Sequence, residues 1–306
     1  MKNLYAYLNE GILNPTNKNN VGTNMSNSTI DSIKQFLKDN YSNLNNYIIS
    51  KKPNKDGLYE VSVSDNVNVK WDNKLPRLTN GLFRFNIVNG DFNCTWCGLE
   101  TLEGAPRKVT GKFDCDNNKL TSLEGAPEKC ASFDCSKNNI TSFNGCPKDV
   151  KIVIAGDVNI KNLEGLPNGI ESLFLKRCFE LTSLKGCPDV SIQVVLQDCT
   201  KLKSLKGLPS DLHAFACKFC NKLKNLEGLP KVINGTFICM NCEGLISYKG
   251  CPEIVGRDCV LFGNKNVMSI DGIPKEVGEM LDLRQNGKEF SEKEIKTVCL
   301  VKGFIA

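Results

Sequence analysis

Apolar residues recur in blocks of 20 to 22 residues along most of this chain of 306 residues. Each block aligns as L-x-L-x-x-(N/C)-x-(x)-L, where L stands for any apolar residue, and nine blocks end in Gly-x-Pro. The clearest copy runs from Phe113 to Pro127. Apolar positions that alternate with polar ones are typical of a strand with one buried face, and a fixed period of this length predicts that the blocks stack as a solenoid.

The alignment predicts ten strands, each parallel to the one before it. Their buried positions are Phe92 and Cys94, Phe113 and Cys115, Phe133 and Cys135, Ile152 and Ile154, Leu173 and Leu175, Val194 and Leu196, Phe215 and Cys217, Phe237 and Cys239, Cys259 and Leu261, and Leu281 and Leu283.

The sixth position of each block follows the strand and is filled by a short side chain that can form hydrogen bonds. In order it is Cys97, Asn118, Asn138, Asp157, Cys178, Cys199, Cys220, Cys242, Asn264 and Asn286. Such a side chain can satisfy backbone groups of the adjacent turn, Asn well and Cys weakly. We therefore expect this column to connect neighbouring turns.

The segment before the array has a different pattern. Residues 1–27 are expected to form an N-terminal arm and linker, with apolar residues at helical spacing near its start. Residues 28–90 are expected to form an α+β capping region, because a solenoid end exposes apolar interior. Within it we predict a helix from Ser28 to about Tyr41 and a hairpin made by Tyr59–Val63 and Val67–Trp71.

The array itself is assigned to residues 91–286, and the rest of the chain, 287–306, to a C-terminal capping helix. Ser291 is followed three residues later by Glu294, which is the pattern of a capping box. Ile295, Val298 and Cys299 are expected on one apolar face of that helix.

Composition and charge narrow the possible classes of protein. The net charge of +5 is spread along the chain, so no specific nucleic-acid partner is expected. The sequence contains no run of 18 apolar residues, so no membrane span is expected, and the N-terminus lacks the apolar core of a signal peptide. The sixteen cysteines are expected to be reduced thiols inside the repeats rather than a disulfide scaffold.

Three Cys-x-x-Cys pairs, which begin at Cys94, Cys217 and Cys239, have the spacing of zinc ligands. The repeat offers a simpler explanation, because other blocks place Leu or Ile and Asn at the same two positions. The only histidine, His213, has no phased nucleophile that the sequence can place beside it. We therefore expect no metal, no cofactor and no enzyme activity.

The residues between the two buried positions of each strand should face outward on the sheet. They are Asn93, Asp114, Asp134, Val153, Phe174, Val195, Ala216, Ile238, Val260 and Asp282. Six consecutive blocks present an apolar residue there. β-branched residues suit any strand, but a contiguous exposed apolar band is more often an interface. The residues expected to bind a protein partner, or a second copy of the chain, are Val153, Phe174, Val195, Ala216, Phe219, Ile238, Met240, Val260 and Phe262.

The repeat text Leu120–Pro127 resembles the short leucine-rich repeats of tailed-bacteriophage proteins, and Lys55–Val61 and Leu78–Phe83 resemble the segment that precedes such arrays. The resemblance implies an α/β fold: a leucine-rich-repeat solenoid with a parallel β-sheet on its concave face. It also implies a non-catalytic scaffold for protein–protein interaction, either a component of the phage particle or a host-directed factor in the cytoplasm of the infected cell. The alternative is a surface adhesin or ligand-binding module of the particle.

Overall fold

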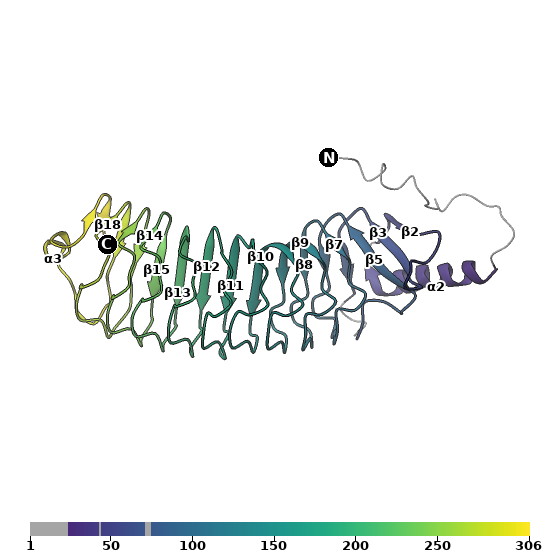
Figure 1. The fold of residues 1–306 in the computed structure, drawn as a ribbon, viewed down its shortest axis with the longest axis horizontal. Helices are drawn as coiled ribbons and strands as arrows, with labels where there is room; N and C mark the ends of the chain where they lie inside the picture. The colour runs from purple at the N-terminus through teal and green to yellow at the C-terminus, as the bar shows by residue number, and fades with distance from the viewer. Residues whose placement is uncertain (1–23, 43, 71–74) are drawn as a thin grey trace.

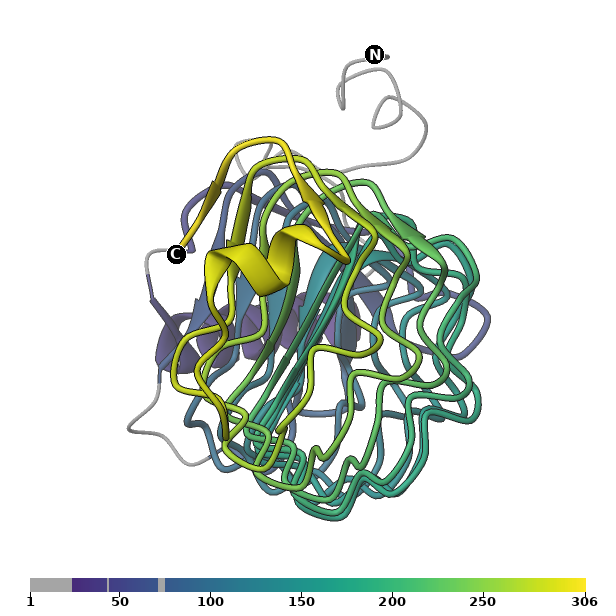
Figure 2. The ribbon, with the colours of Figure 1, turned by 90° about the vertical axis from the view of Figure 1, so that its left-hand side faces the viewer.

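The computed structural model describes residues 24–42, 44–70 and 75–306. They form a mostly parallel β-solenoid of about 12 turns with few helices (Figure 1). Viewed along its axis, successive turns lie one behind another (Figure 2). Most of the predicted arm 1–27, including the apolar residues at helical spacing near its start, and Trp71 lie outside the described residues.

A sheet of 17 strands runs the length of the solenoid. All ten predicted strands are present, and each pairs in parallel with the next. They are β6 (Phe92–Asn93), β8 (Lys112–Asp114), β9 (Lys129–Asp134), β10 (Asp149–Gly156), β11 (Ser172–Lys176), β12 (Gln193–Gln197), β13 (Ala214–Lys218), β15 (Phe237–Met240), β17 (Cys259–Val260) and β19 (Met280–Asp282).

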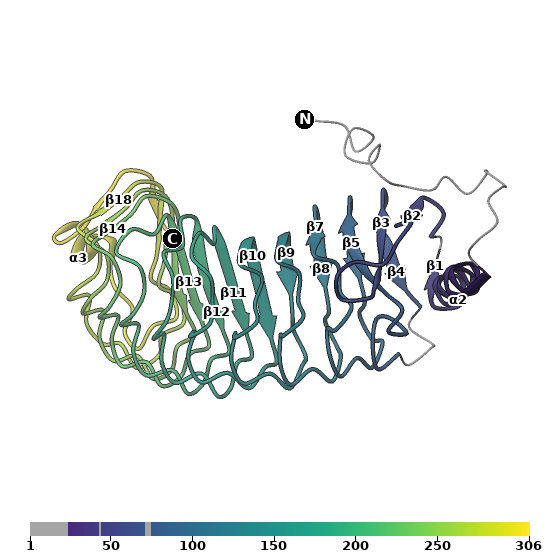
Figure 3. The same ribbon diagram turned by 45° about the vertical axis from the view of Figure 1, so that its right-hand side comes forward.

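A second strand segment precedes the main strand in several turns. Near the N-terminus it is β5 (Phe83–Val88) and β7 (Lys108–Val109), which belong to the large sheet. Towards the C-terminus it forms a separate four-stranded parallel sheet of β14 (Val232–Ile233), β16 (Ile254–Val255), β18 (Glu276–Val277) and β20 (Leu300–Val301). The strands stand side by side along the molecule, with loops along the opposite edge (Figure 3).

The interior is built from equivalent residues of successive turns. Phe92, Phe113 and Phe133 are fully buried, and their rings stack with centroid separations of 5.4 Å and 5.9 Å. Each residue thus packs on its counterpart one turn away. Because a single turn cannot bury its own apolar side, the turns are stable only as a stack.

The Asn residues of the sixth column connect neighbouring turns as predicted. Asn264 Nδ2 donates to the carbonyls of Cys239 and Leu261, both at 2.9 Å, and its Oδ1 accepts from the N–H of Cys242 at 3.0 Å. A cysteine in this column does less: the Cys178 thiol reaches the carbonyl of Ala155 at 3.4 Å. An Asn side-chain amide in this column therefore forms hydrogen bonds with buried backbone groups of two turns at once.

The glycine of each Gly-x-Pro has a structural reason that the sequence pattern does not show. Gly145 has φ 88°, and a Cβ on it would lie 2.5 Å from the Leu123 carbonyl carbon of the previous turn. Gly165 is held in the same way against Phe143. These positions need both a left-handed backbone and the space that glycine leaves.

The helix α2 (Asn24–Asn40) lies at the N-terminal end of the solenoid and begins four residues before the predicted start (Figures 1 and 3). Its Ile33 and Leu37 are buried. Two short strands, β1 (Tyr41–Ser42) and β2 (Tyr47–Ile49), then pair antiparallel with β4 (Val67–Val69) and β3 (Tyr59–Val63).

The predicted hairpin in this region is wrong. β3 pairs in parallel with β5, and β4 in parallel with β6. The residues between β3 and β4 form a corner of a turn, where the Val67 N–H donates to the carbonyl of Asp91 one turn on. Pairing with the next turn therefore overrides the local signal, and parallel pairing begins before the predicted boundary at residue 91.

The C-terminal segment is also not simply a helix. α3 (Glu292–Lys296) has five residues and carries the predicted capping box between Ser291 and Glu294. Ile295 and Cys299 are buried as predicted, but Val298 is 46% exposed. After α3, β20 and β21 (Phe304–Ile305) pair in parallel with β18 and β19. The open edges of both sheets are thus extended by one more turn.

Candidate functional site

The outward residues of the large sheet form a column in which each residue lies opposite its counterpart on the next strand. This central column is Asn93, Asp114, Asp134, Ile154, Phe174, Val195, Ala216, Ile238, Val260 and Asp282. Its six apolar members, from Ile154 to Val260, are called the apolar band. Polar residues border the band at both ends.

The predicted register is wrong in the block that contains β10. Val153 is fully buried and lies opposite Phe133 and Leu173, both core residues, so it cannot belong to a binding surface. Its half-buried neighbour Ile154 takes the outward place. The true register differs from the predicted one by one residue, so every side chain of the strand faces the side opposite to the predicted one.

The same shift affects the sixth column, where the buried Val158 stands in place of Asp157. Asp157 has φ 52° and belongs to a left-handed column with Asn117 and Arg177. Spacing gives the signal that was missed. Leu120 and Ile140 each lie two residues after a column Asn, and Ile160 lies two residues after Val158.

The other predicted partner-binding residues lie on the outward side. Phe174, Val195, Ile238 and Val260 are half-buried, and Ala216 is 9% exposed. Phe219 is 39% exposed in the left-handed column, with φ 57°. Met240 and Phe262 are half-buried in a second column beside the band. That second column, defined by strand register and by backbone hydrogen bonds between turns, is Thr95, Asp116, Ser136, Gly156, Lys176, Gln197, Lys218, Met240, Phe262 and Arg284.

A hollow of about 460 Å³ lies over the start of the apolar band. Ile154, Phe174 and Val195, from three successive strands, contribute to its lining. Gly156 leaves it open, because this position of the second column has no side chain. Charged and polar side chains, among them Asp116 and Lys176, line the rest. The hollow can receive an apolar side chain bordered by polar groups.

Ion pairs hold most charges around this hollow. Lys112 Nζ lies 2.7 Å from Asp114 Oδ2 and 3.0 Å from Asp134 Oδ2. Burial opposes the charge of Lys112, but hydrogen bonds to the two carboxylates outweigh it and raise the pKa of this lysine. Lys112, Asp114 and Asp134 therefore form one ion-paired group.

Two further pairs join adjacent turns. Arg177 Nε donates to Asp157 Oδ1 at 2.6 Å and holds the pKa of that carboxyl below its usual range. Lys137 Nζ lies 3.3 Å from Asp116 Oδ2, while burial raises the pKa of Asp116. The other oxygen of Asp116 is buried and has no hydrogen-bond partner among the described residues.

Lys176 and Lys218 differ from these cations. They stand two strands apart in the second column, with Gln197 between them. No carboxylate of a described residue lies within 4.0 Å of either ammonium group, although nineteen other ion pairs form across the described chain. Asp198 is adjacent in sequence to Gln197, and its Oδ2 accepts a hydrogen bond from Gln197 Nε2 at 3.1 Å.

The cysteines behave as interior residues. All sixteen are free thiols, and all but Cys187 and Cys251 are buried. Burial raises the pKa of Cys97 to about 11 and that of Cys130 to about 12. Within the described part of the chain, no group of three or more His, Cys, Asp or Glu side chains is arranged to hold a metal ion.

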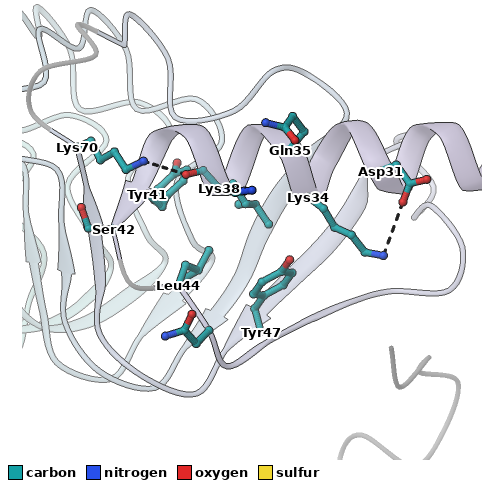
Figure 4. A pocket seen from close by; sticks show the side chains of 11 residues that line it. Asp31, Lys34, Gln35, Lys38, Tyr41, Ser42, Leu44, Tyr47 and Lys70 are labelled. Atoms are coloured by element: carbon teal, nitrogen blue, oxygen red, sulfur yellow. Dashed lines mark hydrogen bonds and ion pairs between the residues drawn. The ribbon is translucent and has the colours of Figure 1, made fainter. Parts of the chain in front are cut away.

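A second hollow, of about 910 Å³, lies beside α2 (Figure 4). Two of its three lysines already have partners among the described residues. Lys34 lies 3.7 Å from Asp31, and Lys70 Nζ donates to the carbonyls of Lys38 and Asp39, both at 2.9 Å. This hollow therefore offers a ligand fewer free charges than the sheet does.

Comparison with known proteins yields no relative: no protein-family model, no curated protein and no solved structure matches the chain. No helix among residues 24–42, 44–70 and 75–306 is long and apolar enough to cross a membrane.

Proposed function

We propose that this chain is a non-catalytic scaffold that binds a protein partner through the outward side of its large sheet. The observation that carries the proposal is the apolar band, in which six consecutive turns from Ile154 to Val260 present an apolar residue. A folded stack does not require this, since other turns place Asp114, Asp134 and Asp282 there. A contiguous apolar strip bordered by polar residues has the composition of an interface core with its rim.

We further propose that the solenoid is of the leucine-rich-repeat type and that this side of the sheet is its concave face. The Asn column, the block length and the resemblance of Leu120–Pro127 to phage repeats support this assignment. On the same resemblance, the chain is either a component of a phage particle or a factor that acts on a protein of the infected host.

The test compares a variant with two substitutions on the band with a control variant that has the same kind of substitutions outside it. In a double variant, Phe174→Asp with Ile238→Asp, two carboxylates replace half-buried apolar residues, so partner binding should fall about 100-fold or more. The matched control is Phe179→Asp with Ile246→Asp, which changes residues 47% and 59% exposed that lie outside the band. Circular dichroism checks that both variants fold. If the two variants bind the recovered partner equally well, the band is not the interface.

A further inference from the structure

We infer that the partner segment is an amphipathic α-helix that carries acidic residues seven positions apart beside its apolar stripe. This inference rests on the proposed function, because it describes what the same face would bind. It comes from Lys176 and Lys218, two cations on the outward side of the sheet that have no carboxylate partner among the described residues, and from their position beside the apolar band.

The charge of the partner follows from which cations are already neutralised. On the outward side of the sheet, Lys112, Lys137, Arg177 and Arg284 each have a carboxylate within 4.0 Å. Lys176 and Lys218 have none among the described residues. A partner that covers the band would exclude water from both ammonium groups, and carboxylates opposite them would offset that cost.

The shape of the partner follows from the strand spacing. Lys176 on β11 and Lys218 on β13 are two strand steps apart, which is roughly 10 Å at the usual spacing of neighbouring strands. In a helix, residues seven apart are separated by about 10.5 Å and share one face. An extended chain of that span needs about three residues, and its side chains alternate, so the two acids would point to opposite sides.

The length and direction of the segment follow in the same way. From Ile154 to Val260 the band crosses five strand steps, or roughly 24 Å, which is the length of a helix of about 16 residues. Beyond Lys218 the second column becomes apolar, with Met240 and Phe262. The acidic half of the helix should therefore lie over β11–β13 and its most apolar half over β15 and β17.

The test uses two displayed libraries of helix-favouring 16-residue peptides. Both randomise the apolar stripe, and they differ in having Glu or Lys at two flanking positions seven residues apart. We expect the full chain to select binders from the Glu library and few from the Lys library. In the Lys176→Glu, Lys218→Glu chain the preference should reverse, and the selected Glu peptides should bind on the order of tenfold more weakly.

The control is a chain with the same change in net charge, Lys203→Glu with Lys224→Glu. These exposed lysines lie on the loops of two successive turns, outside the sheet. This chain should keep the wild-type preference. Equal selection from both libraries, or a preference that the Lys176 and Lys218 reversals leave unchanged, would overturn the inference.

The same measurements separate this inference from the proposed function. Lys-library binders that lose affinity in the Phe174→Asp, Ile238→Asp chain would leave the band as an interface and overturn the acidic helix. Binders from either library that ignore those two substitutions would overturn both.

Discussion

Asn118 Nδ2 donates to the carbonyl oxygen of Cys94 in the preceding turn at 2.9 Å, across the buried interior of the solenoid. Its Oδ1 accepts from the backbone N–H groups of Cys97 and Leu99, at 3.1 Å and 2.9 Å. One amide therefore completes the backbone of a turn to which it does not belong.

Replacement of Asn118 by alanine should destabilise the protein by about 3 kcal/mol or more, because several buried backbone groups lose their partner. The free energy of unfolding in urea measures this. Asn139→Ala is the control, since Asn139 is exposed on the next block. A similar loss in both variants would show that the amide of Asn118 is not what joins the turns.

Gly145→Ala should destabilise the protein more than Gly169→Ala. Both glycines have a left-handed backbone, with φ 88° and 81°. A Cβ at Gly145 would lie 2.5 Å from the Leu123 carbonyl carbon, whereas a Cβ at Gly169 has no neighbour within 4 Å. Both variants should carry a backbone cost of about 1–2 kcal/mol, and Gly145→Ala an additional packing cost of about 1–3 kcal/mol.

Urea unfolding of the two variants under the same conditions gives the difference directly. Equal destabilisation would mean that only the backbone conformation matters at these glycines and that adjacent turns are free to separate by the width of a methyl group.

The register of β10 can be tested with adjacent residues. Val153→Asp would place a carboxylate in the core and should unfold the chain or cost more than about 4 kcal/mol. Ile154→Asp changes a half-buried outward residue and should keep the native circular dichroism spectrum. The opposite result, with Ile154→Asp unfolded and Val153→Asp folded, would restore the register that the sequence pattern first suggests.

This block shows why the sequence predicts the fold better than the site. The period of apolar residues defines the stack and its ten strands, because each block repeats the same packing. At Val153 the run from Val150 to Ala155 has apolar residues at nearly every position, so alternation cannot identify the buried face. A miscount of one residue leaves the fold unchanged but exchanges a surface residue for a core residue.

The strand pairing at the N-terminal end and the ion pairing of the lysines depend on contacts between turns, which no local sequence pattern contains. β3 and β4 look like a hairpin in the sequence, yet each pairs with the next turn. Lys176 cannot be distinguished in the sequence from Lys112, and only the arrangement of carboxylates shows which lysine is left without an acid. The positions of these strands and carboxylates relative to one another are set only when the turns stack.

Above about pH 8.5 the protein should lose stability through its buried thiols. Burial raises the pKa of Cys97 to about 11 and that of Cys130 to about 12, whereas thiols of the unfolded chain ionise near pH 8.5. Below that pH Cys97 and Cys130 hold the proton in both states, so these two thiols add no pH dependence. As the pH rises, the unfolded state releases protons first, so each such thiol should lower the free energy of unfolding by about 1.4 kcal/mol per pH unit.

Urea unfolding from pH 7 to pH 10, with a reductant present, measures this slope. Cys130→Ala should reduce the slope by the share of one thiol, whatever its effect on stability at pH 7. A free energy of unfolding that stays level up to pH 10 would mean that these thiols ionise as easily in the folded chain as in the unfolded one. Such a result would contradict the burial of Cys97 and Cys130 in the solenoid.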